Sequence, residues 1–178
     1  AGIWLYHCST APMSMHIANG MFGAVIIDPT DLDKVDREYV MVASELYLGA
    51  DGQSADASLL SALAPNAMAF NGVPFQYKAH PIQVKTNERV RVWVMDAGPN
   101  LATTFHVVGT QFDTVWREGA YVIRGGGSGG GWSQVLSLGA AEGGFVEFTP
   151  LEAGHYAFVN HALSLAEKGQ TGVFEVTD

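Results

Sequence analysis

Hydrophobic and polar residues alternate over short stretches of this chain, and glycine, proline and aspartate separate those stretches. In IQVKTNERVRVWVMD, an extended backbone would place Val90, Val92 and Val94 on one face and Arg91 and Trp93 on the other. No helical periodicity is sustained over more than about ten residues. The pattern therefore predicts an all-β chain folded as an antiparallel β-sandwich.

Turn residues divide the chain into candidate elements. The expected strands are GIWLYHC, FGAVIID, REYVMVASELYLG, IQVKTNERVRVWVMD, TTFHVVGTQFDTVW, FVEFTP, GHYAFVNH and TGVFEV. We expect a polar connector at DLDKVD and one short helix around Leu59–Leu63, within a loop rich in small residues. The glycine-rich GGGSGGG at 125–131 is followed by neither the helix nor the lysine that a phosphate-binding loop requires, so we expect a flexible loop there.

Composition and charge narrow the class of protein. A chain of 178 residues, 48% of them hydrophobic, is long enough for one large or two small globular domains. It has no apolar run of about eighteen residues, so we expect no membrane span. The net charge of −9 argues against nucleic acid and anionic membranes as partners. The opening AGIWLYHC lacks the features of a signal peptide, and the single cysteine excludes an intramolecular disulfide.

The segment YHCSTAPMSMHIANGM, residues 6–21, gathers side chains that bind soft metals. A thiolate, two imidazoles and a weak thioether form the ligand set of a blue-copper electron-transfer site. Cys8, His16 and Met21 supply three of these ligands, and one more histidine is needed from elsewhere. In the alternative interpretation, Cys8 is a small buried hydrophobic residue, Met21 belongs to the core and His16 lies on the surface. The proline, the glycine and the flanking strands favour the copper loop.

His7 directly precedes Cys8, and adjacent strand residues point to opposite faces. If Cys8 faces a copper ion inside the sandwich, then His7 points outward, where it is either solvated or bound to a second metal. In the second case a single peptide unit would join two copper ions by a short covalent path.

These residues resemble the copper-containing nitrite reductases. YHCSTAPMSMHIANGMFGAVIIDP resembles their type 1 copper loop, in the subgroup with the shorter spacing between cysteine and histidine. The similarity continues through TTFHVVGTQFDTVW and GGFVEFTPLEAGHYAFVNHALSLAEKGQTGVFEV, and it is weakest across 50–66 and 117–141. It implies a cupredoxin-like Greek-key β-sandwich, with residues 1–35 as the C-terminal strands of a first domain and residues 36–178 as a complete second domain.

The resemblance implies two copper sites. Cys8, His16 and Met21 would bind a type 1 copper. His7 and His161 would bind a type 2 copper, which His161 reaches across a subunit boundary of a homotrimer.

The resemblance assigns a catalytic role to His106, in TTFHVVG, which would help to deliver protons without binding metal. His80 and His155 match no ligand, and we expect both to be exposed. The remaining copper-binding histidines and a catalytic aspartate would lie upstream of Ala1. We therefore expect a separate or missing N-terminal segment to complete the fold.

The implied reaction is the reduction of nitrite to nitric oxide, with electrons passing from the type 1 to the type 2 copper through Cys8 and His7. A small cupredoxin or cytochrome would donate the electron. The resemblance also implies an extracytoplasmic location, in the periplasm or on the cell surface.

Other interpretations make different demands on the sequence. A laccase-like multicopper oxidase needs paired His-x-His motifs, but the chain has none, and Ser9 follows Cys8 where such oxidases place a histidine. An electron-transfer cupredoxin without catalysis would leave His7, His106 and His161 unexplained. A structural sandwich with degenerate copper sites stays open, because upstream ligands are missing from this chain.

Two tryptophans raise a separate question about a surface for the electron donor. Trp4 and Trp93, if exposed, could form a docking patch. Packing of Trp93 against another domain or a neighbouring subunit is the better explanation of its place on the polar side of its strand.

Overall fold

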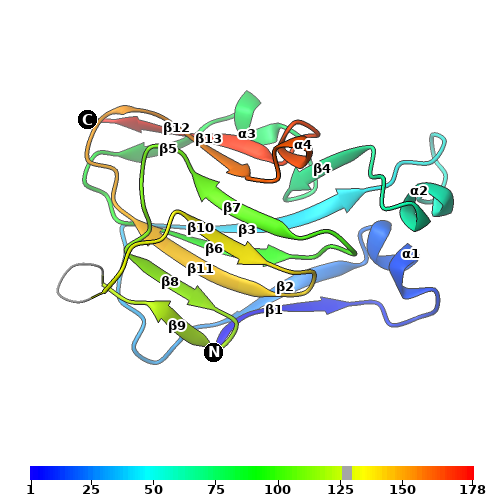
Figure 1. Ribbon diagram of the computed structural model, residues 1–178, viewed down its shortest axis with the longest axis horizontal. Helices are drawn as coiled ribbons and strands as arrows, with labels where there is room; N and C mark the ends of the chain where they lie inside the picture. The colour runs from blue at the N-terminus through cyan, green and yellow to red at the C-terminus, as the bar shows by residue number, and fades with distance from the viewer. Residues whose placement is uncertain (126–129) are drawn as a thin grey trace.

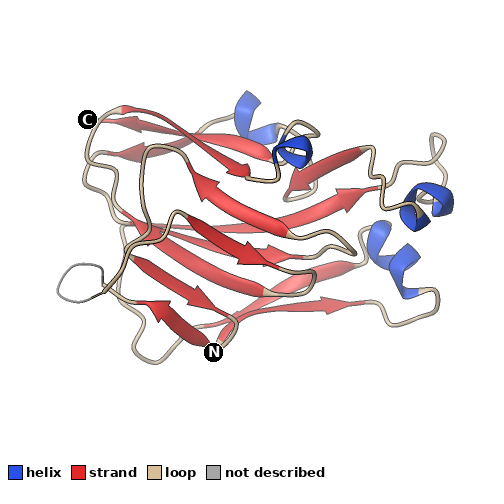
Figure 2. Cartoon of the chain, viewed as in Figure 1, coloured by secondary structure: helices blue, strands red, loops and turns tan. Residues whose placement is uncertain are grey.

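The computed structural model describes residues 1–125 and 130–178, and strands dominate it (Figure 1). Figure 2 shows that the short helices lie in the connections, outside the sheets. The glycine-rich loop predicted at 125–131 falls mostly outside the described residues. The predicted all-β fold is confirmed.

Two sheets form the sandwich, and a two-stranded ribbon lies against it. The six-stranded sheet has the order β4(Ala67–Phe70), β3(Arg37–Leu46), β6(Val90–Asp96), β11(Gly143–Phe148), β8(Thr114–Arg117), β9(Ala120–Ile123). The five-stranded sheet has the order β10(Val135–Leu138), β7(Thr103–Val107), β12(Gly154–Asn160), β13(Thr171–Thr177), β5(Ile82–Lys85). The β1–β2 ribbon pairs β1(Gly2–His7) with β2(Phe22–Ile27).

Four short helices lie in the connections: α1(Met13–Ala18), α2(Ala57–Ser61), α3(Gln76–Ala79) and α4(Leu163–Ala166). The helix expected around Leu59–Leu63 is present as α2, which begins and ends two residues earlier than expected. Asp56 explains that start, because its carboxylate accepts hydrogen bonds from the backbone nitrogens of Ser58 and Leu59 and so caps the helix.

The prediction that the sandwich is antiparallel is wrong for two strand pairs. β3 runs parallel to β6, and β5 runs parallel to β13. Parallel neighbours need long crossover connections, and residues 47–89 and 86–170 provide them. The alternation of side chains cannot reveal this, because it is the same in both kinds of pair.

Strand β6 is buried on both faces, which the sequence pattern did not indicate. Val90, Val92 and Val94 belong to the main core between the two sheets. On the opposite face, Trp93 packs in a second core with Ile3 of the β1–β2 ribbon. Trp93 is only 1% exposed, so the docking patch that included it is wrong, and its packing within the chain explains its position.

Arg91 lies on the face of β6 opposite the main core, where it is buried in an ionic network. Arg91 is 3% exposed and lies 2.6 Å from a carboxylate oxygen of Glu147 on β11. Glu38 on β3 accepts from both Arg91 and the indole nitrogen of Trp93. These contacts satisfy the charges that burial would otherwise leave unpaired.

Candidate metal centre and histidine pair

The cysteine loop, residues 8–21, connects the two strands of the ribbon. Its ends are closed by a hydrogen bond from the backbone nitrogen of Cys8 to the carbonyl of Met21, at 3.0 Å. Helix α1, which the sequence pattern did not reveal, carries His16 back toward the cysteine. The Sγ atom of Cys8 and Nδ1 of His16 lie 3.4 Å apart.

This geometry fits two ligands of one metal ion. A tetrahedral metal with a sulfur ligand at about 2.3 Å and a nitrogen ligand at about 2.0 Å holds those two atoms roughly 3.5 Å apart, close to the separation found here. Hydrogen bonds from Thr10 lower the pKa of the Cys8 thiol, which favours the thiolate form that binds metal. The thiol and the imidazole are the soft and borderline donors that copper prefers.

Met21 completes the predicted set less directly. Its backbone carbonyl pairs with Cys8, while its side chain is 51% exposed. Its role as a ligand stays a prediction.

His7 is the last residue of β1 and is exposed, whereas Cys8 is partly buried. Nδ1 of His7 donates a hydrogen bond to the carbonyl oxygen of Cys8, at 2.8 Å. Because Nδ1 carries the proton, Nε2 has a free lone pair that could bind a metal.

The histidine pair, His106 and His161, lies on the five-stranded sheet. His106 is on β7, and His161 directly follows the neighbouring strand β12. Their ring centres are 5.1 Å apart, and the ring planes meet at 78°. The backbone nitrogen of His161 donates to the carbonyl of Thr104 at 2.8 Å, so the two segments are held in register next to the rings.

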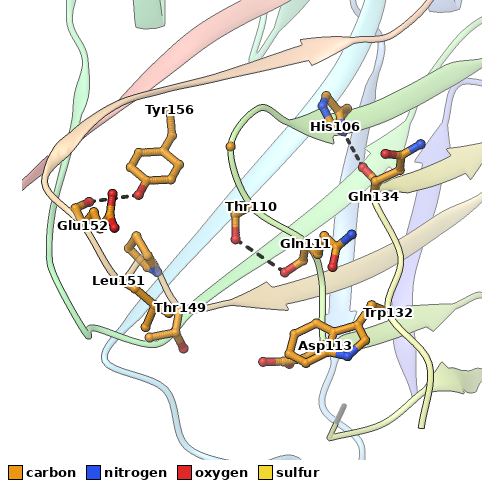
Figure 3. A pocket seen from close by; sticks show the side chains of 12 residues that line it. His106, Thr110, Gln111, Asp113, Trp132, Gln134, Thr149, Leu151, Glu152 and Tyr156 are labelled. Carbon is orange, nitrogen blue, oxygen red and sulfur yellow. Dashed lines mark hydrogen bonds between the residues drawn. The ribbon is translucent and has the colours of Figure 1, made fainter. Parts of the chain in front are cut away.

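Nδ1 of His106 donates to the backbone carbonyl of Gln134, at 2.5 Å (Figure 3). This bond leaves Nε2 of His106 free to accept or pass a proton. A cavity of about 810 Å³ lies beside the ring, and its other lining residues are Gly109, Thr110, Gln111, Asp113, Trp132, Gln134, Thr149, Pro150, Leu151, Glu152 and Tyr156. His161 borders a separate hollow, which it shares with Gln134.

His80 and His155 are exposed, as predicted. The ring of His155 lies 3.6 Å from the carboxylate of Glu175 on the protein surface.

The two groups of candidate ligands are separate in the part of the chain that the structure describes. Across residues 1–125 and 130–178, no three histidine, cysteine or acidic side chains converge in a way that could hold a metal ion. Nor does a ring contact or side-chain hydrogen bond link His7 to His106 or His161 in that part of the chain.

Sequence reasoning missed the polar residues that hold the histidine pair in place. Asn160, Thr104 and Gln170 form buried or partly buried hydrogen bonds behind His161. The available signal was an asparagine directly after the hydrophobic run YAFV, residues 156–159. A buried amide on a strand requires partners, and their positions depend on the fold.

Comparison with known proteins first identifies the family to which the chain belongs. The family model described as multicopper oxidase matches residues 51–178, and the chain belongs to this family. Structures named multicopper oxidase or blue copper oxidase share the β-sandwich, but those below 25% identity support the fold alone.

Proteins that are more similar in sequence to this chain are named copper-containing nitrite reductases. A copper-containing nitrite reductase of Neisseria meningitidis serogroup A is 37% identical over 98% of this chain and 46% of its own length. The solved copper nitrite reductase of Nitrosomonas europaea superposes with a TM-score of 0.85 at 30% identity, covering 99% of this chain and 62% of that chain. The nitrite reductase structure of Thermus scotoductus has the same TM-score at 25% identity, covering 98% and 41%.

These neighbours identify the sandwich as cupredoxin-like. The chain spans about half the length of the curated relatives that it matches. Within the described residues, no helix is long and apolar enough to cross a membrane.

Proposed function

We propose that this chain is part of a copper-dependent enzyme that reduces nitrite to nitric oxide. The observation that carries the proposal is the histidine pair, with ring centres 5.1 Å apart on adjacent strands of the sandwich. An electron carrier that used only the cysteine loop would have no need of these two rings. The relatives named copper-containing nitrite reductases support the same conclusion.

Bound copper would supply one-electron chemistry at both positions. Cys8, His16 and Met21 would hold a type 1 copper, and His7 with His161 would hold part of a type 2 site. The fit of the first set rests on the 3.4 Å separation of the thiol and imidazole donors. The fit of the second rests on the free Nε2 of His7 and on the imidazole chemistry of both residues.

The overall reaction combines nitrite, one electron and two protons to give nitric oxide and water. Cys8 and His7, joined by one peptide unit, provide a covalent path for the electron. His106 is the residue we assign to proton delivery, because its Nδ1 is fixed by Gln134 while Nε2 stays free. The electron would come from a small cupredoxin or cytochrome, and we place the reaction outside the cytoplasm.

The complete site needs more than one copy of this chain. We propose a homotrimer in which His161 of one subunit meets His7 of another. Sedimentation velocity of the copper-loaded protein tests this arrangement, because a monomer with full activity would contradict it.

We also propose that residues 1–35 end a first cupredoxin domain and that residues 36–178 form the second. The outer face of the β1–β2 ribbon supports this, since Trp4, Tyr6, Val25 and Ile27 are between 37% and 60% exposed there. The other strands of a first domain, from a separate or missing N-terminal segment, would cover this apolar face. Intact mass spectrometry tests it: a folded, blue species near 19 kDa without a partner peptide would contradict the idea.

The direct test is nitrite-dependent nitric oxide production by the copper-loaded assembly. His161→Ala should abolish turnover and leave the blue absorption intact, since the cysteine loop is unchanged. His155→Ala is the matched control, because it removes an exposed histidine from the same strand region. Full activity in the His161 variant would reject the site, and oxygen reduction instead of nitrite reduction would favour a laccase-like enzyme.

A further inference from the structure

Asn160 is a fully buried polar residue at the end of β12, one position before His161. Its amide oxygen accepts hydrogen bonds from the backbone nitrogen of Thr104 at 3.1 Å and from the Thr104 hydroxyl at 2.8 Å. The same oxygen accepts from the backbone nitrogen of Ala162 at 3.1 Å. One side chain thus binds the chain just beyond His161 and the strand that carries His106.

The amide nitrogen of Asn160 has two acceptors on other segments. It donates to the side-chain oxygen of Gln170 at 2.6 Å and to the carbonyl of Ala102 at 3.3 Å. Gln170 is also fully buried, and its own amide nitrogen donates to the carbonyl of Ala69 at 3.3 Å. Gln170 therefore fixes the orientation of the Asn160 amide, with the oxygen toward Thr104.

The network needs an amide at this position. Aspartate has the same shape but only acceptor oxygens, so it would face Gln170 and Ala102 without a proton to share. An apolar residue would leave several buried polar groups unpaired, at about 1–3 kcal/mol each. Every buried side-chain nitrogen and oxygen in the described part of the chain has a partner, so this loss would not be masked by existing defects.

We propose that Asn160, oriented by Gln170, is a positioning residue that sets the place of His161 relative to His106. It acts through the backbone of Thr104 and Ala162, which flank the two histidines, and in the described residues its side chain forms no hydrogen bond with either ring. This inference rests on the proposed copper-binding role of His161. Outer contacts that orient a metal-binding histidine alter metal affinity by about 10- to 100-fold when they are removed.

The experiment uses the complete, copper-loaded assembly and the variant Asn160→Asp. Type 2 copper is followed by electron paramagnetic resonance and by competition with a chelator, and the blue absorption serves as an internal reference. We expect an altered type 2 signal and copper affinity lower by about 10- to 100-fold, with unchanged blue absorption. A folded variant with the original type 2 signal and affinity would overturn the proposal.

A matched control separates positioning from loss of stability. Val84→Ala truncates a buried core residue on β5, at the opposite edge of the same sheet from β10. It should lower the melting temperature and leave the type 2 signal unchanged. A type 2 signal altered equally by Val84→Ala would mean that general destabilisation explains the effect, and would overturn the proposal.

A second variant keeps the test valid if Asn160→Asp does not fold. Thr104→Val retains the shape of the side chain and removes the hydroxyl that bonds Asn160 and Ala162. It should change the type 2 signal in the same direction, and an unchanged signal would reject the positioning role. Retention of type 2 copper by His161→Ala would instead refute the proposed function, so the two failures are distinguishable.

Discussion

The cysteine loop and the histidine pair are built in opposite ways. Cys8 and His16 are eight positions apart in sequence, and a short connection with one helix brings them to 3.4 Å. His106 and His161 are 55 positions apart, and they meet because β7 and β12 are neighbours in a sheet. The first group depends mainly on local structure, whereas the second depends on the whole sandwich.

This difference explains what the sequence could and could not predict. Spacing within residues 6–21 pointed to Cys8, His16 and Met21 without any knowledge of the fold. His106 and His161 were found only through a family resemblance, since no local pattern connects them. Their support from Asn160 and Gln170 was not found at all, because it depends on which strands pair.

Most of the strands were predictable for the same reason. Alternation is a local property, and it located β1, β2, β3, β11, β12 and β13 within a few residues. The single strands expected at 82–96 and 103–116 are wrong, because each covers two strands separated by a turn, β5 with β6 and β7 with β8. Sheet order and the two parallel pairs are set by long-range contacts, which alternation does not encode. The burial of Trp93 was hidden because the residues that pack with it are distant in sequence, from Ile3 on β1 to Phe145 on β11.

The largest expected effect follows from removal of the thiol. Cys8→Ser should abolish the blue absorption and reduce nitrite turnover to background, because the thiolate is the anionic ligand of the proposed type 1 site. The type 2 signal should persist, since Cys8→Ser keeps the backbone carbonyl that accepts from His7 and leaves both His7 and His161 unchanged. Optical absorption and electron paramagnetic resonance spectra of the copper-loaded protein measure the two signals. Blue absorption in the Cys8→Ser variant would contradict the assignment of Cys8 to the type 1 site.

Truncation of a core side chain should disturb the histidine pair more than the cysteine loop. Phe158 on β12 is fully buried, and the rings of Phe105 and Phe174 lie 6.0 and 4.9 Å away. Phe158→Ala should lower the free energy of unfolding by about 3–5 kcal/mol, because it leaves a cavity beneath the strand that precedes His161.

Urea denaturation measures this loss, and hydrogen exchange locates it. Faster exchange should centre on β7 and β12, with less change in the cysteine loop. Val122→Ala, at a 63% exposed position, is the control and should change stability by less than about 0.5 kcal/mol. Faster exchange confined to the cysteine loop would contradict the conclusion that the histidine pair depends on the whole sandwich and the loop on local structure.

Asp96 should make the stability of the region around the histidine pair depend on pH. Its oxygens accept from the backbone nitrogens of Gly98 and Thr103, at the entrance to β7. Burial, with the nearby charge of Glu45, raises the pKa of Asp96 to about 7. The folded protein thus keeps a proton that the unfolded chain releases, so this stabilisation is full below about pH 4 and is lost as pH rises through 7.

Asp96→Asn should remove this pH dependence. The stability of the unchanged protein should fall relative to the variant between pH 4 and pH 8, by about 1.4 kcal/mol for each unit of pKa difference. Urea denaturation at several pH values measures the difference, which cancels the titration of other groups. Parallel curves for the two proteins would contradict the pKa shift.

The smallest effect concerns the support of the cysteine loop. Asp56 caps α2, which lies beside α1, and the nitrogen of Ala55 donates to the side chain of Asn19 at 2.9 Å. Asp56→Ala should cost about 1 kcal/mol of stability and leave the blue spectrum unchanged. Asp51→Ala, at an exposed position in the same segment, should cost almost nothing. A changed blue spectrum would show that the loop depends on this neighbour more than its local construction suggests.

Strand β6 carries a consequence for how the molecule melts. One of its faces completes the main core, and the other receives the β1–β2 ribbon through Trp93 and Ile3. Neither layer can separate without exposing a side of the same strand, so the ribbon and the sandwich should unfold in one cooperative step. Strand β6 belongs to both hydrophobic cores, so a destabilising substitution on it should lower the stability of the ribbon and of the sandwich together.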